Sequence, residues 1–262
     1  MAIQKAEAIV LHGRRQGETS KIVTVYSREY GKLSLMAKGS RGVRSKYLGT
    51  LETFNHVAIV FYHKEERQMQ YLSQASILQP FSKLHEQLGR ISLAGIPCEI
   101  IEKSEIEHHA HPQQFQLLLD TLLALETQTS GLRNIVRAFM LQFVSGAGFE
   151  PELTRCRGCS RAETTEVNYF SLQQGNYSCG ACGPIPQEGR RISGYALQLL
   201  RWFSSVPVAY AAQVQTDKTT GDELDSILFD YLVSHIEALA ALKSFAHLQK
   251  LQAKLIKSVS SD

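Results

Sequence analysis

The chain has 262 residues, of which 44% are hydrophobic and 20% charged, and its formal net charge at pH 7 is +3. This is the composition of an ordinary globular protein, long enough for two domains or for one domain with an appended module. No apolar run approaches the roughly 18 residues of a membrane span, and the first residues lack the apolar core of a signal peptide. We therefore expect a cytoplasmic protein without a membrane partner.

The positive charge is concentrated at the N-terminal end. Residues 1–46 carry ten Lys or Arg and three acids, a balance of +7, so residues 47–262 sum to −4. A basic module on a mildly acidic body predicts a polyanionic partner held by one end of the molecule. The alternative is a basic face that is merely solvated.

The first eighty residues alternate between apolar and polar side chains with the period of a β-strand. Five short strands in this length leave no room for crossover helices, so we expect a small closed barrel over residues 1–80. An OB-like barrel and an SH3-like barrel both fit, and periodicity does not separate them. The expected strands are Lys5–Leu11, Lys21–Tyr26, Lys32–Ala37, His56–Tyr62 and Met69–Leu72.

From about Phe81 the apolar spacing becomes helical, which predicts an α-helical domain over residues 81–262 and an α+β fold overall. One helix ends at the glycines that follow Val144. A last long helix begins near Asp222 and is expected to extend beyond Leu242, before a frayed tail at 258–262. The expected helical stretches are 81–96, 115–125, 135–144, 193–203 and 222–242.

Four cysteines follow the pattern C-x2-C, nineteen residues, C-x2-C. Two such thiolate pairs, brought together by a short hairpin, supply the tetrahedral sulfur set of a zinc ribbon. Two disulfides or a redox C-x-x-C are the alternatives, although the odd fifth thiol, Cys98, fits a reducing compartment better than a disulfide framework. We expect one structural Zn²⁺ in an insertion over residues 152–188, with no coordination position left for a substrate. Its ligands are Cys156, Cys159, Cys179 and Cys182.

The segment 31–47 is the strongest candidate for binding. It follows a strand into a Gly/Ser loop with cations about three residues apart, and such a loop allows long basic side chains to reach phosphates. The expected DNA contacts are Lys32, Lys38, Arg41, Arg44 and Lys46, with Tyr47. Tyr47, Tyr26, Tyr30 and Phe54 could offer stacking faces for unpaired bases. A solvated loop and aromatic side chains buried in the barrel core are the alternatives.

The sequence gives little support for an enzyme. It contains no P-loop, dinucleotide-binding fingerprint, nucleophile elbow or zinc-protease motif. His108, His109 and His111 lie near Glu105 and Glu107, but they precede Pro112 at a junction between helices, where an exposed polar turn is the common outcome. We therefore expect neither catalysis nor a second metal site.

The chain as a whole resembles the bacterial recombination-mediator family RecO. Four segments carry the resemblance. They are residues 8–11, residues 17–27 with 30–32, the segment Ala37-Lys38-Gly39-Ser40-Arg41, and Tyr169-Phe170-Ser171 with Gly175 before Cys179. It implies an OB-fold domain, a helical domain and a zinc module. It further implies binding of single- and double-stranded DNA, annealing of complementary strands, and location at the nucleoid. The implied partners are RecR, in places RecF, the C-terminal tail of single-stranded-DNA-binding protein and, indirectly, RecA.

Two details of this interpretation concern residues outside the barrel. A pocket for the acidic protein tail needs a cationic rim, and Arg133 and Arg137, one helical turn apart, are candidates on chemistry alone. Arg155, Arg157 and Arg161 flank the first cysteine pair and suit a rival function, an RNA-associated zinc ribbon of the transcription or translation machinery. A purely structural interaction module, without affinity for nucleic acid, is the third alternative.

Overall fold

The computed structural model describes residues 2–42, 44–64, 67–162, 166–184 and 189–244. The described chain forms two compact units. Unit 1 contains the residues up to Glu126 together with Lys243 and Ser244, and unit 2 contains Thr127–Leu242. The expected division into residues 1–80 and 81–262 concerns independent folding and stays a prediction. The tail expected at 258–262 lies outside the described residues.

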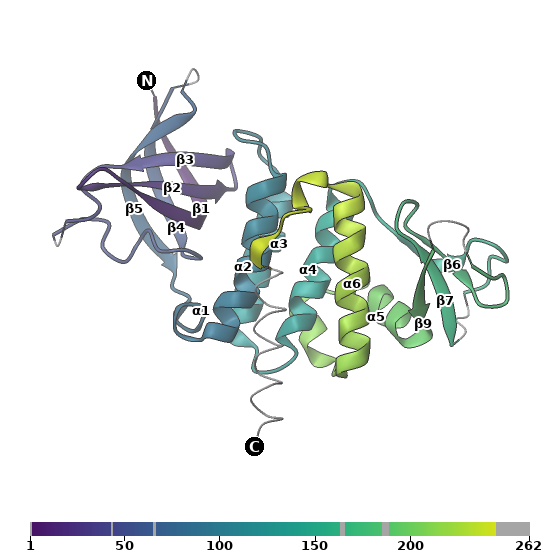
Figure 1. Cartoon of the computed structure of the whole chain (residues 1–262). Coiled ribbons are helices and arrows are strands. Elements are labelled where there is room, and N and C mark those ends of the chain that lie inside the picture. The colour runs from purple at the N-terminus through teal and green to yellow at the C-terminus, as the bar shows by residue number, and fades with distance from the viewer. Residues whose placement is uncertain (1, 43, 65–66, 163–165, 185–188, 245–262) are drawn as a thin grey trace. The chain divides into compact units, whose positions relative to one another are not determined.

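Unit 1 begins with a closed barrel of five strands, drawn in purple and blue in Figure 1. The order around the barrel is β1-β2-β3-β5-β4, and β3 and β5 are parallel whereas the other neighbours are antiparallel. This Greek-key order is that of an OB fold, which decides between the two barrels that the sequence left open. The strands are β1 (Ala2–Gln16), β2 (Ser20–Ser27), β3 (Gly31–Ala37), β4 (His56–His63) and β5 (Met69–Gln79).

Alternation along the strands places one set of side chains inside the barrel. In β3, for example, Leu33, Leu35 and Ala37 are fully buried whereas the residues between them are partly exposed. The barrel core is completed by side chains from all the other strands and from the loop after β3, among them Val10, Val25, Tyr47, Leu51, Ile59, Phe61 and Leu72. The alternation thus builds the core and leaves every second side chain of β3 outside it.

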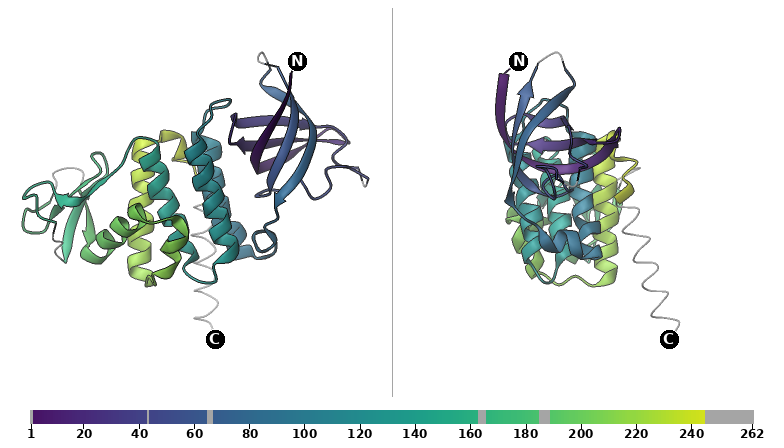
Figure 2. Two further views of the ribbon diagram at one scale, coloured as in Figure 1. Left: turned by 180° about the vertical axis from the view of Figure 1, so that it is seen from behind. Right: turned by 90° about the vertical axis from the view of Figure 1, so that its left-hand side faces the viewer.

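Helices α1 (Ser82–Glu86), α2 (Leu88–Ser104) and α3 (Pro112–Thr127) follow the barrel. Helix α2 is joined to β1 and β2 by polar contacts at its C-terminal end. The ring nitrogen Nε2 of His12 lies 2.8 Å from a carboxylate oxygen of Glu102, and the Tyr26 hydroxyl donates to Glu105 at 3.0 Å. Figure 2 shows the barrel and these helices from two further sides. These contacts connect the barrel to the helices within unit 1.

Unit 2 consists of packed helices with a small sheet to one side of them (Figure 1). Helices α4 (Leu132–Gly146), α5 (Gly194–Ser205) and α6 (Lys218–His235) pack together with the short 3-10 helices η1 (Val208–Gln213) and η2 (Glu237–Leu239). Between α4 and α5 the chain forms a four-stranded sheet in the order β6-β8-β7-β9, so the cysteine segment is an insertion between helices, as predicted. The strands are β6 (Glu152–Cys156), β7 (Val167–Ser171), β8 (Asn176–Cys179) and β9 (Gly189–Ser193).

The last expected helix differs from the observed one at both ends. Helix α6 begins at Lys218, where the Asp217 side chain accepts the Thr220 amide as an N-cap, and it ends at His235 rather than beyond Leu242. The backbone angles of Ile236 are not helical (φ −131°, ψ 87°), although no Gly or Pro at this position predicts the end of the helix. Among the described helices, none combines the length and apolar character needed to cross a membrane.

Candidate nucleic-acid interface and metal centre

The loop after β3 is fixed to the turn between β1 and β2. The Arg41 amide donates to the Thr19 carbonyl at 3.0 Å, and the Arg41 guanidinium donates through Nη1 to the Gly17 carbonyl at 2.8 Å. Gly17 and Gly39 both have positive φ, which glycine adopts without strain. The basic segment therefore lies beside the hairpin that carries Arg14 and Arg15, two exposed cations that we did not include among the expected contacts.

Four of the five predicted cations lie on the surface. Lys38, Arg41, Arg44 and Lys46 are exposed, and no ion pair is found between them and an acid in the described residues. The Lys46 ammonium donates to the Ser73 carbonyl at 2.6 Å, which holds it near β5. These four residues, with Arg14 and Arg15, are called the basic loop cluster below.

Lys32 does not belong to this cluster. Its ammonium donates to the Glu102 carbonyl at 2.5 Å, in the last turn of α2, where carbonyl groups carry the negative end of the helix dipole. The side chain is half-buried. Lys32 thus stabilises the contact between β3 and α2, and its expected position in the DNA groove is not what the structure gives.

The aromatic side chains expected to stack are largely in the core. Tyr47 is only 4% exposed, and its hydroxyl donates to the Leu72 and Ser73 carbonyls at 3.0 Å each. Tyr26 and Phe54 are buried as well, whereas Tyr30 is half-buried. Tyr47 therefore anchors the loop from inside the barrel and offers no ring face to a base in this conformation.

A cation–aromatic cluster that the sequence did not reveal lies on the barrel surface. The Lys38 ammonium is 4.7 Å from the centre of the Tyr71 ring, and the Arg67 guanidinium carbon is 5.6 Å from it. Each such contact at an exposed site contributes about 0.5–1 kcal/mol. Stacking of a base on an aromatic ring contributes about 1–3 kcal/mol, so a base can displace either cation. The parallel pairing of β3 with β5 creates this cluster, and periodicity does not predict that pairing.

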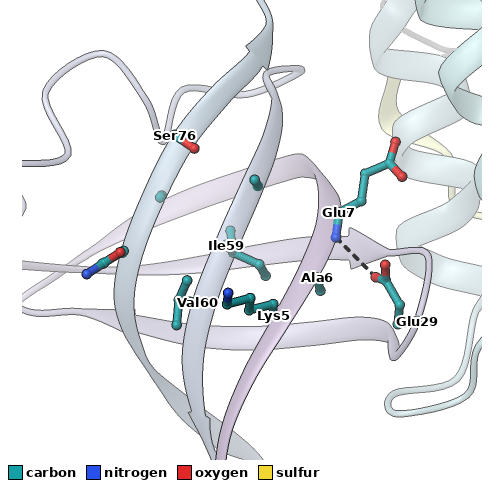
Figure 3. A pocket seen from close by; sticks show the side chains of 10 residues that line it. Lys5, Ala6, Glu7, Glu29, Ile59, Val60 and Ser76 are labelled. Atoms are coloured by element: carbon teal, nitrogen blue, oxygen red, sulfur yellow. Dashed lines mark hydrogen bonds between the residues drawn. The ribbon is translucent and has the colours of Figure 1, made fainter.

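A shallow groove of about 340 Å³ runs along the outside of β1, β4 and β5. Figure 3 shows Lys5, Val60 and Ser76 on three neighbouring strands, with the Glu7 amide donating to Glu29 at one end. The hollow exists because the side chains that line it from β4 and β5 are small: Ala58, Ala75 and Ser76. The groove is open and has both apolar and polar walls.

The histidines before Pro112 do not form a metal site in the described residues. His108, His109 and His111 are exposed, as expected for a polar turn, and no set of three or more ligand atoms converges there. Glu105 is instead buried and lies 2.7 Å from the Nδ1 atom of His111. This loop contributes contacts within unit 1.

Of the two arginines expected at a protein-docking rim, Arg137 is buried in unit 2 and Arg133 is partly exposed. Arg137 is 4% exposed, and its guanidinium donates to Asp225 at 2.7 Å, to Asn134 at 2.7 Å and to the Gly221 carbonyl at 3.0 Å. Arg133 bonds the other oxygen of Asp225. Arg137 therefore joins α4 to α6 and is buried, so its expected position at a surface rim is wrong for this structure.

The four cysteines converge as their spacing predicted. Strands β6 and β8 are parallel neighbours, and each ends at the first cysteine of its pair, Cys156 and Cys179. The hairpin of β7 and β8 returns the chain to this position, so the sulfurs meet at adjacent strand ends. Gly158 is required in the first turn, because a Cβ there would lie 2.9 Å from the Cys182 sulfur.

The sulfur geometry matches a tetrahedral metal. All four sulfurs lie within 4.8 Å of one another, and the Sγ atoms of Cys159 and Cys179 are 3.8 Å apart. Zn–S bonds of about 2.3 Å at tetrahedral angles separate the sulfurs by about 3.8 Å, whereas a disulfide joins them at about 2.0 Å. The arrangement can hold one metal ion, and no disulfide joins these cysteines. It is the only cluster of three or more such ligands among the described residues.

The charges of the cluster also suit a cation. Burial opposes ionisation of Cys156, but amide donors, chiefly from Cys179, Cys159 and Gly158, outweigh burial and lower the pKa of this thiol to about 6. The pKa of Cys182 is raised to about 12, first because its thiol donates to Cys159 and then because it donates to Cys179. The thiolate form of Cys156 is thus favoured, and a divalent cation bound here would replace thiol protons.

Comparison with known proteins gives the family. The family model "Recombination protein O N terminal" matches residues 1–81, and "Recombination protein O C terminal" matches residues 85–244. The chain belongs to the RecO family. A protein named DNA repair protein RecO from Pelotomaculum thermopropionicum is 31% identical over 250 residues, covering 95% of each chain. Relatives of the same name from Salinibacter ruber and Roseiflexus sp. are 29% and 27% identical and cover 88% of this chain each, and 87% and 80% of their own lengths.

RecO membership agrees with the observed architecture. The first matched region coincides with the barrel β1–β5, and the second includes the helices and the cysteine cluster. The family and the names of the relatives support a role in DNA repair and recombination for this chain. The resemblance that the sequence suggested is therefore confirmed.

Proposed function

We propose that this chain is a non-enzymatic recombination mediator that binds single- and double-stranded DNA and anneals complementary strands. The observation that carries the proposal is the basic loop cluster on an OB barrel of a RecO-family chain. Annealing needs no catalytic residue. A protein that neutralises phosphates on two strands removes their repulsion and raises their local concentration, while base pairing supplies the driving force.

The DNA contacts in this proposal are Lys38, Arg41, Arg44 and Lys46, with Arg14 and Arg15 beside them. Exposed cations without acidic partners are available to phosphates, and the contacts of Arg41 to Gly17 and Thr19 order the loop before DNA arrives. Pre-ordering lowers the entropy cost of binding. Lys32 and Tyr47 support the same region from within, through α2 and the barrel core.

The metal in this proposal is one structural Zn²⁺ held by Cys156, Cys159, Cys179 and Cys182. Four thiolates complete its shell, so zinc would supply stability and no Lewis-acid chemistry. The ion would connect β6 and β8 at their ends and fix the short insertion between α4 and α5.

The proposed partners follow from the family. They are RecR, in places RecF, the acidic tail of single-stranded-DNA-binding protein and, through them, RecA, with the protein acting at the nucleoid. The buried contacts of Arg137 remove the earlier candidate for the tail pocket, so the proposal assigns no residues to these protein partners.

Charge reversal tests the DNA interface. Arg41, Arg44 and Lys46 are changed together to Glu, and binding of a single-stranded oligonucleotide is measured as salt is varied. We expect affinity at low salt to fall and the slope of log K against log salt to shrink by about 0.7 for each lost phosphate contact. Unchanged binding would mean that this cluster is not the interface.

The matched control reverses the same number of charges at the first cysteine turn. Arg155, Arg157 and Arg161 are exposed and lie in unit 2, and their change to Glu should leave DNA binding intact. The opposite result, with RNA bound more tightly than DNA, would favour the RNA-associated zinc ribbon. Failure of the wild-type protein to anneal strands coated with single-stranded-DNA-binding protein would remove the mediator function.

A further inference from the structure

A row of aromatic and apolar side chains crosses the outside of the barrel. Met36 of β3 lies opposite Tyr71 of β5, and Tyr71 lies opposite Tyr62 of β4. Tyr62 in turn lies opposite Ile3 of β1. Because side chains alternate along a strand, these four point away from the core. Their neighbours in the chain are buried inside the barrel: Leu35, Ala37, Phe61 and Leu72.

This outer row is accessible. Ile3 is 64% exposed, and Met36, Tyr62 and Tyr71 are half-buried. A contiguous apolar patch on a protein surface can mark an interaction site, whereas single exposed apolar side chains are common. The row comes from four different strands, so the closed barrel positions it rigidly.

The chemistry around Tyr71 favours nucleic acid. Lys38 and Arg67 come from two different loops and both lie over Tyr71. Neither forms an ion pair with an acid in the described residues. An aromatic ring flanked by cations presents a stacking face for a base and charges for the phosphates beside it.

The groove of Figure 3 continues the same surface along the strands. Lys5, Val60 and Gln74 are paired across β1, β4 and β5, and Val60 lies two residues before Tyr62 in β4. Gln74 and Ser76 offer hydrogen-bonding groups in this hollow, beside small or apolar side chains such as Ala58, Val60 and Ala75 and the charged Lys5, Glu7 and Glu29. A flat ring with polar edges, which is the shape of a nucleobase, fits such a hollow.

We infer that the outer row Met36–Tyr71–Tyr62–Ile3 binds the unpaired bases of single-stranded DNA, with Tyr71 as the principal stacking face. The inference rests on the proposed DNA binding and adds selectivity to it. The basic loop cluster contacts phosphates, which both strand forms possess, whereas bases in a duplex are stacked on one another and cannot reach Tyr71. The row therefore distinguishes single strands from duplexes.

The test compares Tyr71→Ala with the wild-type protein on a single-stranded oligonucleotide and on a duplex of the same length. We expect binding of the single strand to weaken at least about five-fold, since loss of one stacked base has effects of this order or larger. Duplex binding should change less than two-fold. The slope of single-strand binding against salt should stay the same, because stacking releases no counterions.

Two further variants act as controls for this measurement. Tyr71→Phe keeps the ring and should bind the single strand as the wild type does. Tyr210→Ala removes another exposed tyrosine, in unit 2, and should have no effect. Circular dichroism establishes that each variant is folded. A folded Tyr71→Ala protein with wild-type affinity for single strands would overturn the inference, while loss of binding in the charge-reversed loop would still support the proposed function.

A fluorescence measurement reports the stacking directly. The chain has one tryptophan, Trp202, so Tyr71→Trp in a Trp202→Phe background carries a single reporter on the outer row. Its emission should be quenched by a saturating oligo-dT strand and not by a duplex. Equal quenching by both forms, or quenching by neither, would overturn the inference; if neither form binds the wild-type protein, the proposed function fails as well. Emission that responds instead to an added protein partner would assign the row to protein docking and also overturn it.

Discussion

The guanidinium of Arg201 on α5 donates through Nε to the carbonyl oxygen of Leu153 on β6 at 2.5 Å. Its Nη2 atom donates to the Tyr177 hydroxyl at 2.9 Å. Leu153 and Tyr177 are buried, and both lie on the strands that end at the cysteines. A single side chain therefore links the strands that carry the cysteine cluster to helix α5 of unit 2.

We expect Arg201→Ala to lower the stability of unit 2. The substitution removes the Arg201 donor from the buried Leu153 carbonyl, at a cost of about 1–3 kcal/mol. The Tyr177 hydroxyl keeps its hydrogen bond to the Arg161 carbonyl. Thermal unfolding followed by emission of Trp202, the next residue, measures the effect. Arg191→Ala removes an exposed arginine of β9 and serves as the control. Equal unfolding temperatures for both variants would show that the link is not stabilising.

Loss of a metal ligand should unfold the insertion before it affects DNA binding. Cys156→Ser and Cys179→Ser are expected to reduce bound zinc from about one ion per chain and to lower the unfolding temperature, because metal affinity is part of the folding free energy. Elemental analysis and calorimetry measure the two effects. Cys98→Ala, at a buried thiol far from the cluster in sequence, should keep its zinc. A folded, zinc-free variant that fails to bind DNA would instead give the cysteine turns a direct role.

The buried charges between α4 and α6 predict strong coupling. Arg137→Met leaves Asp225 short of a partner at a buried site, and breaking such a pair costs about 3–5 kcal/mol. The double variant Arg137→Met with Asp225→Leu should be more stable than the sum of the two single losses predicts. Urea unfolding of the four proteins in the cycle gives the coupling energy. Arg133→Ala should cost less, because the Arg133 side chain is 28% exposed. Additive losses would show that the pair is not coupled.

The contact between His12 and Glu102 predicts how the stability of unit 1 depends on pH. The Glu102 side chain raises the pKa of His12 above its ordinary 6.5, chiefly through their hydrogen bond and against the effect of burial. The same hydrogen bond lowers the pKa of Glu102 below 4.5. The histidine contribution is therefore complete below pH 6.5 and is lost as the pH rises through the raised value. The carboxylate contribution is present above pH 4.5 and is lost as the pH falls through the lowered value.

The pair should consequently stabilise unit 1 most between about pH 4.5 and 6.5. His12→Gln should lower the unfolding temperature more at pH 5.5 than at pH 8.5, and the effect should be small because both side chains are more than a third exposed. Glu102→Gln should show the same difference between the two pH values. A loss for His12→Gln that is independent of pH would contradict the assignment.

The barrel shows how far sequence periodicity predicts structure. The five strands were found in order, because alternation records which side chains are buried, and each proved longer than expected. Alternation does not indicate which strands are neighbours. The parallel pairing of β3 with β5, and with it the cation–aromatic cluster at Tyr71, could therefore not be predicted. The same limit explains Lys32 and Tyr47: a residue can lie in a basic segment while its side chain contacts a helix or the core.

Covalent spacing gave better predictions than charge. The cysteine pairs were assigned correctly as one cluster, because short loops with fixed spacing leave few ways to bring four sulfurs together. Arg133 and Arg137 share a helix face, but their spacing does not say whether that face is covered, and Asp225 lies 88 residues further along from Arg137. The end of α6 at His235 likewise depends on the backbone angles of Ile236, and no Gly or Pro there predicts them.

The carboxylate of Glu99 on α2 accepts the amides of Lys243 and Ser244 at 3.0 and 2.7 Å. The chain thus leaves unit 1 after Glu126 and rejoins it more than a hundred residues later, so that unit 2 is inserted into unit 1 in the covalent sequence. A truncation after Leu242 would therefore take contacts away from α2, and a shortened protein without unit 2 would need a new join between residues 126 and 243. A single proteolytic cut inside unit 2 would leave Lys243 attached to α2 only by hydrogen bonds and packing.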